Sequence, residues 1–181
     1  MENPLVKKEH TLGEIERIDY FRKSIIEFEE QLASIPGSYG DAKRPGQDAI
    51  MNKKNPLKHT IAGGLYIREI FMPKGQLMTT GIHKKEHPFF VLKGDVSVLT
   101  ENGTNRIKAP YNNVTKPGTK RIIYMHEDTV WITVHATEKE SIPEILEDII
   151  AKDFDDPDIS IDVIREKLKL ENSSNLKITK Q

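Results

Sequence analysis

Short apolar runs alternate with turn-forming residues at regular intervals between Ile61 and Thr137. The runs that predict strands cover residues 65–72, 76–80, 87–93, 96–100, 105–109, 121–125 and 130–135, with a further short piece around Val114. Turns separate them, and Asn102-Gly103 is a strong hairpin signal. A last hairpin is predicted around Glu127-Asp128. Many short strands with frequent turns predict a mostly β domain, an antiparallel barrel or sandwich.

A helix is predicted before these strands. From Thr11 to Ile35, apolar residues recur at spacings of three and four. Thr11 and Glu14 fit a capping box, and Pro36-Gly37 ends the pattern. One interpretation is a helix that packs on the rest of the domain. The other is an oligomerisation helix, because the apolar stripe is long and nearly heptad-like, and it predicts a homo-oligomer.

The segments after the strands again favour helix. Ser141 is a predicted N-cap, Pro143 lies in the first turn, and the apolar face runs to Ile150. Another short helix is predicted from Ile161 to Leu170. The sequence therefore predicts five segments. They are an N-terminal helix (residues 1–36), a connecting loop rich in Gly, Pro, Asn, Asp and Lys (37–60), a β domain (61–137), C-terminal helices (138–170) and a polar tail (171–181).

Composition excludes several classes of function. The formal net charge is −1 over 181 residues, which gives no reason to expect binding to nucleic acid or to an anionic membrane surface. There are no cysteines, so disulfides, thiolate metal sites and a cysteine nucleophile are excluded. No apolar run is long enough to span a bilayer, and the N-terminus does not fit a signal peptide. We expect a soluble protein of the cytoplasm.

Two histidines four residues apart, His83 and His87, are the main functional signal. Residues i and i+4 of a strand share a face, so both imidazoles could point into the barrel. Imidazole binds Zn, Fe, Mn, Ni and Cu, and a stable site usually needs a third protein ligand.

Four residues are candidates for that third ligand. Glu86 neighbours His87, so in a regular strand it points to the opposite face, and His126 falls at the tip of a predicted hairpin. The face on which His135 lies depends on the turn at residues 127–128. A two-residue turn places His135 on the face opposite that of Arg121, and a three-residue turn reverses this. His59 lies in the predicted loop, from which it could fold over the mouth of the barrel.

The segment from Gly81 to Gly94 resembles the first motif of the cupin superfamily. Aligned on Gly94, that motif's second histidine falls on His83, its glutamate on His87 and its first histidine on Gly81. The family's second motif is similar to Lys116-Pro117-Gly118-Thr119-Lys120, after which its histidine position is Arg121. The resemblance covers about residues 60–136 and implies a single cupin-like antiparallel β-barrel, or jelly roll, of the RmlC-like double-stranded β-helix type. Two of the usual four ligand positions carry imidazole.

The same segments, with the run from Glu127 to His135, are also similar to small cupin-like proteins of bacteriophage genomes. That resemblance implies a phage-encoded protein, located in the host cytoplasm or the virion.

Arg121 has no lone pair to offer a metal, and a bound dication would repel it unless an anion lay between them. Either Arg121 binds a small anionic ligand together with the histidines, or it pairs with an acidic residue in a structural role.

Three functions remain open at this stage. The first is binding of one divalent transition metal ion (Zn, Fe, Mn or Ni) or a small anionic ligand through His83 and His87, with His135 as a further metal ligand and Arg121 and His59 as ligand-binding residues. The second is a metal-dependent isomerase, lyase or dioxygenase acting on a small anionic substrate. The third is a phage structural or assembly protein that uses the barrel as a scaffold. No catalytic residue is assigned.

Overall fold

The structure is a computed structural model that describes residues 6–34 and 53–166, with the backbone alone for residues 6–12 and 33–34. In chain order, the elements are α1 (Val6–Ser34), β1 (Leu57–Ala62), β2 (Leu65–Met72), β3 (Leu77–Thr79), β4 (Ile82–His83), β5 (His87–Lys93), β6 (Asp95–Thr100), β7 (Gly103–Lys108), β8 (Tyr111–Thr115), β9 (Ile122–Met125), β10 (Thr129–Ala136), α3 (Ile142–Ile149) and β11 (Ile150–Ala151).

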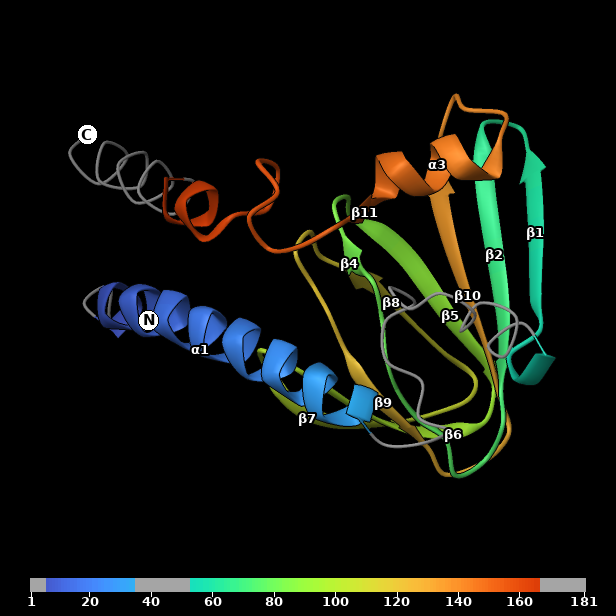
Figure 1. Ribbon diagram of the computed structural model, residues 1–181, viewed down its shortest axis with the longest axis horizontal. Helices are drawn as coiled ribbons and strands as arrows, with labels where there is room; N and C mark the ends of the chain where they lie inside the picture. The colour runs from blue at the N-terminus through green and yellow to red at the C-terminus, as the bar shows by residue number, and fades with distance from the viewer. Residues whose placement is uncertain (1–5, 35–52, 167–181) are drawn as a thin grey trace.

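The strands form two larger antiparallel sheets that face each other (Figure 1). One sheet has the order β1-β2-β10-β5-β8, the other has the order β3-β9-β6-β7, and β4 pairs with β11 in a small third sheet. The mostly antiparallel β fold with flanking helices is therefore confirmed. The hydrogen-bonded ladders of the described residues do not join into one closed barrel.

The core lies between the two larger sheets, because alternate side chains of each strand point inward. The five-stranded sheet contributes Ile70, Met72, Phe89, Val91 and Trp131, and the four-stranded sheet contributes Met78, Val96, Val98, Ile107, Ile123 and Met125. Phe89 and Trp131 stack with ring centroids 4.6 Å apart.

Three expectations about strands were wrong. β9 and β10 do not form a hairpin, since β9 belongs to the four-stranded sheet and β10 to the five-stranded one. Residues 57–60, expected in the loop, belong to β1, which pairs with β2 along its whole length. Ile150, expected on a helix, forms β11 with Ala151 and pairs with β4.

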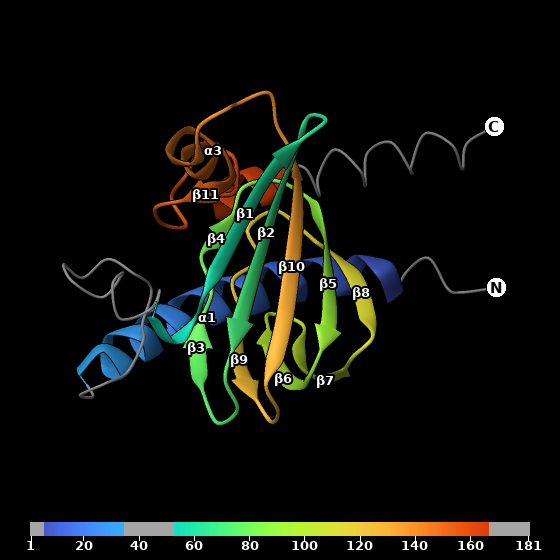
Figure 2. The same ribbon diagram turned by 90° about the vertical axis from the view of Figure 1, so that its right-hand side faces the viewer.

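Helix α1 lies on the far side of the molecule from the five-stranded sheet (Figure 2). It begins at Val6, so Thr11 lies inside the helix and not at its N-cap. Ile25 packs in a cluster with Ile82 and Phe154, which supports the interpretation of a packing helix. Glu29 anchors it further, because this carboxylate accepts from Thr79 Oγ1 at 2.5 Å and pairs with buried Lys120 at 2.8 Å.

Helix α3 carries Pro143 in its first turn, as predicted. Ser141 is the N-cap residue, but its hydroxyl donates to the Glu144 carboxylate and caps no backbone N–H. Residues 161–166 are helical, and the rest of that predicted helix, like the predicted tail, lies outside the described residues. None of the described helices is long and apolar enough to cross a membrane.

We predict that Gly94→Ala destabilises the fold by about 3 kcal/mol or more. Gly94 has a φ of +111°, and a Cβ there would lie 2.3 Å from Thr129 Oγ1 and 2.8 Å from Thr129 Cα, where β5 passes to β6 beside the start of β10. Urea denaturation measures the effect. Gly103→Ala is the matched control, because its φ of +96° is similar but no atom lies within 4 Å. Equal losses in the two variants would contradict the steric account.

Candidate functional site

Three histidines from three strands meet at one end of the space between the sheets. His83 ends β4, His87 begins β5, and His135 lies near the end of β10. His83 and His87 do not share a strand, so the expected reason for their convergence was wrong. Instead, residues 84–86 bend the chain between them. β4 is held in place because Gly118 N donates to His83 O at 2.7 Å and Lys84 N donates to Ile149 O at 2.9 Å.

The three imidazoles are close enough to share one ion after small side-chain movements. Ring centroids are 4.2 Å apart for His83 and His87, 4.1 Å for His87 and His135, and 5.6 Å for His83 and His135. One nitrogen of each ring lies within 4.8 Å of the others. Two nitrogens bound to the same ion at about 2.0–2.1 Å can be at most about 4.2 Å apart.

Four buried nitrogens of this cluster have no hydrogen-bond partner among the residues that the structure describes: His83 Nδ1, His87 Nε2 and both nitrogens of His135. Buried polar atoms are almost always paired, so such a concentration at one point indicates a missing partner. His87 Nδ1 lies 3.1 Å from Lys85 O, a carbonyl that only accepts, so Nδ1 carries the proton and Nε2 has a free lone pair. That arrangement is typical of a histidine that ligates a metal.

Burial keeps the cluster neutral. It lowers the pKa of His83 well below the usual 6.5, that of His87 to about 4 and that of His135 to about 3. Neighbouring imidazoles and the arginines add to the decrease for His83 and His135, whereas the hydrogen bond to Lys85 O opposes it for His87. Neutral imidazole is the form that binds a metal, so all three are ready to ligate at pH 7.

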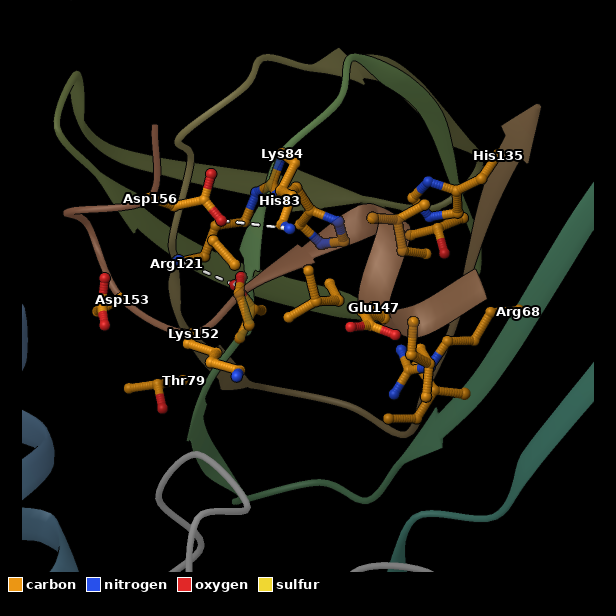
Figure 3. A pocket seen from close by; sticks show the side chains of 18 of the residues that line it. Arg68, Thr79, His83, Lys84, Arg121, His135, Glu147, Lys152, Asp153 and Asp156 are labelled. Carbon is orange, nitrogen blue, oxygen red and sulfur yellow. Dashed lines mark hydrogen bonds and ion pairs between the residues drawn. The ribbon is translucent and has the colours of Figure 1, made fainter. Parts of the chain in front are cut away.

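A cavity of about 940 Å³ opens beside the histidines and is lined by strands of both sheets and by α3 and β11 (Figure 3). Ile70, Met72, Met78, Ile123 and Trp131 supply apolar wall, and His83, His135, Arg68 and Arg121 supply polar groups. His87 is not among the lining residues and is 1% exposed, whereas His83 and His135 both line the cavity. A metal held by the three rings would therefore lie at the cavity surface.

Arg121 faces the cavity with its charge uncompensated by a close carboxylate. Its Nη2 donates to Thr115 Oγ1 at 2.7 Å, and its Cζ lies 5.2 Å from the ring centroid of Phe89 and 5.9 Å from that of Trp131. Among the described side chains, no carboxylate forms a salt bridge with it. Burial lowers its pKa to about 10, which leaves it charged at pH 7. The structural ion pair considered above is therefore not found in the described part of the chain.

Arg68 is a second cavity arginine, and sequence reasoning missed it. It lies on β2 between inward-facing Tyr66 and Ile70, and burial lowers its pKa. The signal in the sequence is the adjacent charged pair Arg68-Glu69 within a strand of apolar residues, since neighbouring side chains of a strand point to opposite faces and one of the two must point inward. Its charge contributes to the lowered pKa values of His83 and His135.

The remaining candidates lie outside the cluster. His59 is on β1 and not in a loop over the barrel mouth, and its Nδ1 is 2.7 Å from the Tyr66 hydroxyl. It does not line the cavity. Glu86 is exposed and pairs with Lys116, and His126 lies 2.8 Å from Ser97 Oγ. Of the predicted ligands, the structure thus brings together His83, His87 and His135, with Arg121 beside them.

No protein-family model and no curated protein matches the chain. Among solved structures, a cupin 2 domain-containing protein from Halorhodospira halophila is similar at 10% identity over 56% of this chain and 72% of that chain, with a TM-score of 0.42. An RmlC-like cupin family protein with a double-stranded β-helix fold from Methanocaldococcus jannaschii matches at 16% identity over 52% and 87%, with a TM-score of 0.41. KdgF from Halomonas sp. matches at 15% identity over 48% and 82%, with a TM-score of 0.41.

We predict that the metal-free protein loses stability as the pH falls from 6.5 to 5. In this window the unfolded chain protonates histidines that the folded chain keeps neutral, so each such histidine lowers the free energy of unfolding by roughly 2 kcal/mol. The loss continues until the folded pKa values near 4 and 3 are reached. Urea denaturation across this range, after chelator treatment, measures it.

His135→Gln is the control for this slope, because glutamine does not titrate. We expect the variant to show a clearly shallower loss between pH 6.5 and 5 than the wild type. The same slope in both proteins would contradict the assignment of the effect to the buried cluster.

Proposed function

We propose that this protein binds one divalent transition metal ion through His83, His87 and His135, and that the bound ion and the cavity arginines together hold a small anionic molecule. The observation that carries the proposal is the set of four buried imidazole nitrogens that converge without hydrogen-bond partners. Leaving such groups unpaired costs about 1–3 kcal/mol each, and one ion ligated by three of them would remove most of that cost.

Three neutral imidazoles favour an ion such as Zn, Fe, Mn or Ni. Because the described residues offer three protein ligands, coordination positions remain for a ligand entering from the cavity. Such an ion supplies Lewis acidity, which polarises an oxygen atom bound to it. The Lys85 carbonyl fixes the orientation of the His87 ring.

The arginines indicate the charge of the ligand. Arg121 contributes to the lowered pKa values of His83 and His87, and Arg68 to those of His83 and His135. Figure 3 shows the two side chains in different parts of the cavity. The two guanidinium groups repel a bound dication, and an anion that lies among the three positive charges relieves this repulsion. A carboxylate or phosphate suits both a metal and a guanidinium. The cavity volume falls in the range of small-molecule sites.

Two alternatives are less well supported. A metal-dependent isomerase, lyase or dioxygenase needs a proton-transfer group beside the ligand. The carboxylates that line the cavity are Glu147 of α3 and Asp153, Asp155 and Asp156 of the segment after β11. Asp156, which Lys84 brings next to the histidines, is held by that lysine in an ion pair of 3.2 Å. A phage assembly scaffold, suggested by the resemblance of the motifs, would have no use for unpaired buried nitrogens.

We predict that protein purified without added metal and titrated with Zn²⁺ or Ni²⁺ binds one ion per chain. His135→Ala is expected to weaken the affinity at least 100-fold, because two ligands remain of three. Isothermal titration calorimetry and elemental analysis measure this. His126→Ala, which lies outside the cluster, is the matched control and should bind like the wild type. Equal affinity in the wild type and His135→Ala would disprove the site.

We predict that Arg121→Gln weakens the binding of a small anion to the Zn²⁺-loaded protein by about 10- to 100-fold, the value of a charge-assisted hydrogen bond. Calorimetric titration with malonate and with inorganic phosphate provides the test. The Zn²⁺ affinity should be unchanged or higher, since a repelling charge is removed. Arg106→Gln, which alters a surface ion pair with Asp95, is the control. Unchanged anion binding in Arg121→Gln would contradict the role of Arg121.

A further inference from the structure

The polarity of the cavity shown in Figure 3 changes along the strands that line it. With distance from the histidine cluster, the inward side chains are His135, Thr133 and Trp131 on β10, and Arg68, Ile70 and Met72 on β2. The other sheet shows the same order, because Arg121 directly precedes β9 and Ile123 lies within it. The cavity therefore has a polar end at the histidines and an apolar end. From Arg68 to Met72, the two ends are about 13 Å apart along a strand.

The wall of the apolar end consists of core residues. They come from both sheets and are Ile70, Met72, Met78, Ile123 and Trp131. Val91, Val96 and Met125 belong to the same core cluster but do not line the cavity. Protein interiors leave few voids larger than a water molecule, and apolar pockets of this size are typical of small-molecule sites. Open space along five core side chains thus indicates a ligand with an apolar part.

Thr133 lies at the border between the two ends. Its Oγ1 is buried and has no hydrogen-bond partner among the residues that the structure describes. On β10 it lies between His135 and Trp131, and strand pairing sets it beside Arg68 of β2. A threonine hydroxyl both donates and accepts, so it suits an oxygen atom of the same group that the arginines and the metal attract. Beyond Thr133, this strand offers a ligand only the indole of Trp131.

The size of the cavity does not suit a small and fully polar anion. At about 30 Å³ per water molecule, a volume of about 940 Å³ has room for roughly 30 water molecules. Malonate or phosphate would replace only a few of them and would leave the apolar end in contact with water. Removing apolar surface from water is favourable, so an anion that also covers this wall would bind more tightly.

We infer that the ligand is an amphiphilic carboxylate, whose head lies at the metal and Arg121 and whose apolar body lies along Trp131 and Met72. This inference rests on the metal and anion binding proposed above and names the class of the anion. The carboxylate oxygens suit the ion, the guanidinium and the Thr133 hydroxyl together. The order of side chains along β10 and β2 fixes the direction of the ligand, with its charge toward the histidines.

Calorimetric titration of the Zn²⁺-loaded protein with acetate, butanoate, hexanoate and octanoate tests the inference. We expect the affinity to rise about fourfold for each methylene group that becomes buried, so octanoate should bind at least about 100-fold more tightly than acetate. Octan-1-ol carries the same chain without the charge, and it should bind at least tenfold more weakly than octanoate. Equal affinities for acetate and octanoate would overturn the inference, and so would equal affinities for octan-1-ol and octanoate.

Malonate distinguishes a failure of this inference from a failure of the proposed function. If malonate binds the Zn²⁺-loaded protein and the alkanoates show no dependence on chain length, the inference is wrong and the proposed function stands. If neither malonate nor any alkanoate binds, both are wrong.

Trp131 reports where the apolar body lies, because it is the only tryptophan of the chain and lines the apolar end. A bromine atom quenches the fluorescence of an indole that it contacts. At saturation, 8-bromooctanoate should therefore remove at least half of the Trp131 emission, whereas octanoate, the matched control, should not quench it. Binding of 8-bromooctanoate without quenching would place the chain elsewhere and would overturn the inference.

Discussion

The packing of two antiparallel sheets against each other determines everything else in this molecule. Because side chains alternate along each strand, one set of positions fills the space between the sheets. Toward the β5–β6 end that space is filled by apolar side chains such as Val91, Val96 and Met125. Toward the other end the inward positions carry His87, His135, Thr133 and Arg68. The same alternation that builds the core therefore also builds the site.

Burial gives this site its chemical character. Imidazoles in water would be partly charged near pH 6.5, but those between the sheets are kept neutral. They keep lone pairs that none of the described protein groups satisfies. Arg121 nearby remains cationic at pH 7, because burial lowers its pKa only to about 10, and the guanidinium of Arg68 is a second cation by its chemistry. Neutral donors surrounded by positive charge are suited to a metal ion whose remaining coordination positions are filled by an anion.

Much of the fold could be predicted from the sequence, because glycine and proline turns mark the ends of the strands clearly. β2 and β5 were predicted with their observed bounds. β1 was missed because Lys58, His59 and Thr60 interrupt its apolar residues, and β11 was missed because Ile150 continues a helical pattern. The connection from β9 to β10 was misread, since a short turn can join two sheets as well as two neighbouring strands.

The site was predicted less completely. His83 and His87 were identified by their spacing, although a bend and not a strand brings them together. The facing of His135 could not be decided, because the assumed hairpin does not exist and the side that His135 faces is set by β2 instead. Arg68 was missed because apolar residues occupy both faces of β2, so the pattern does not show which of Arg68 and Glu69 points inward. X-ray absorption at the Zn K-edge of the Zn²⁺-loaded protein tests the central claim most directly. The account predicts three imidazole nitrogens at about 2.0–2.1 Å from the ion, falling to two in His135→Ala, whereas a spectrum without imidazole scattering, or one unchanged by that substitution, would contradict it.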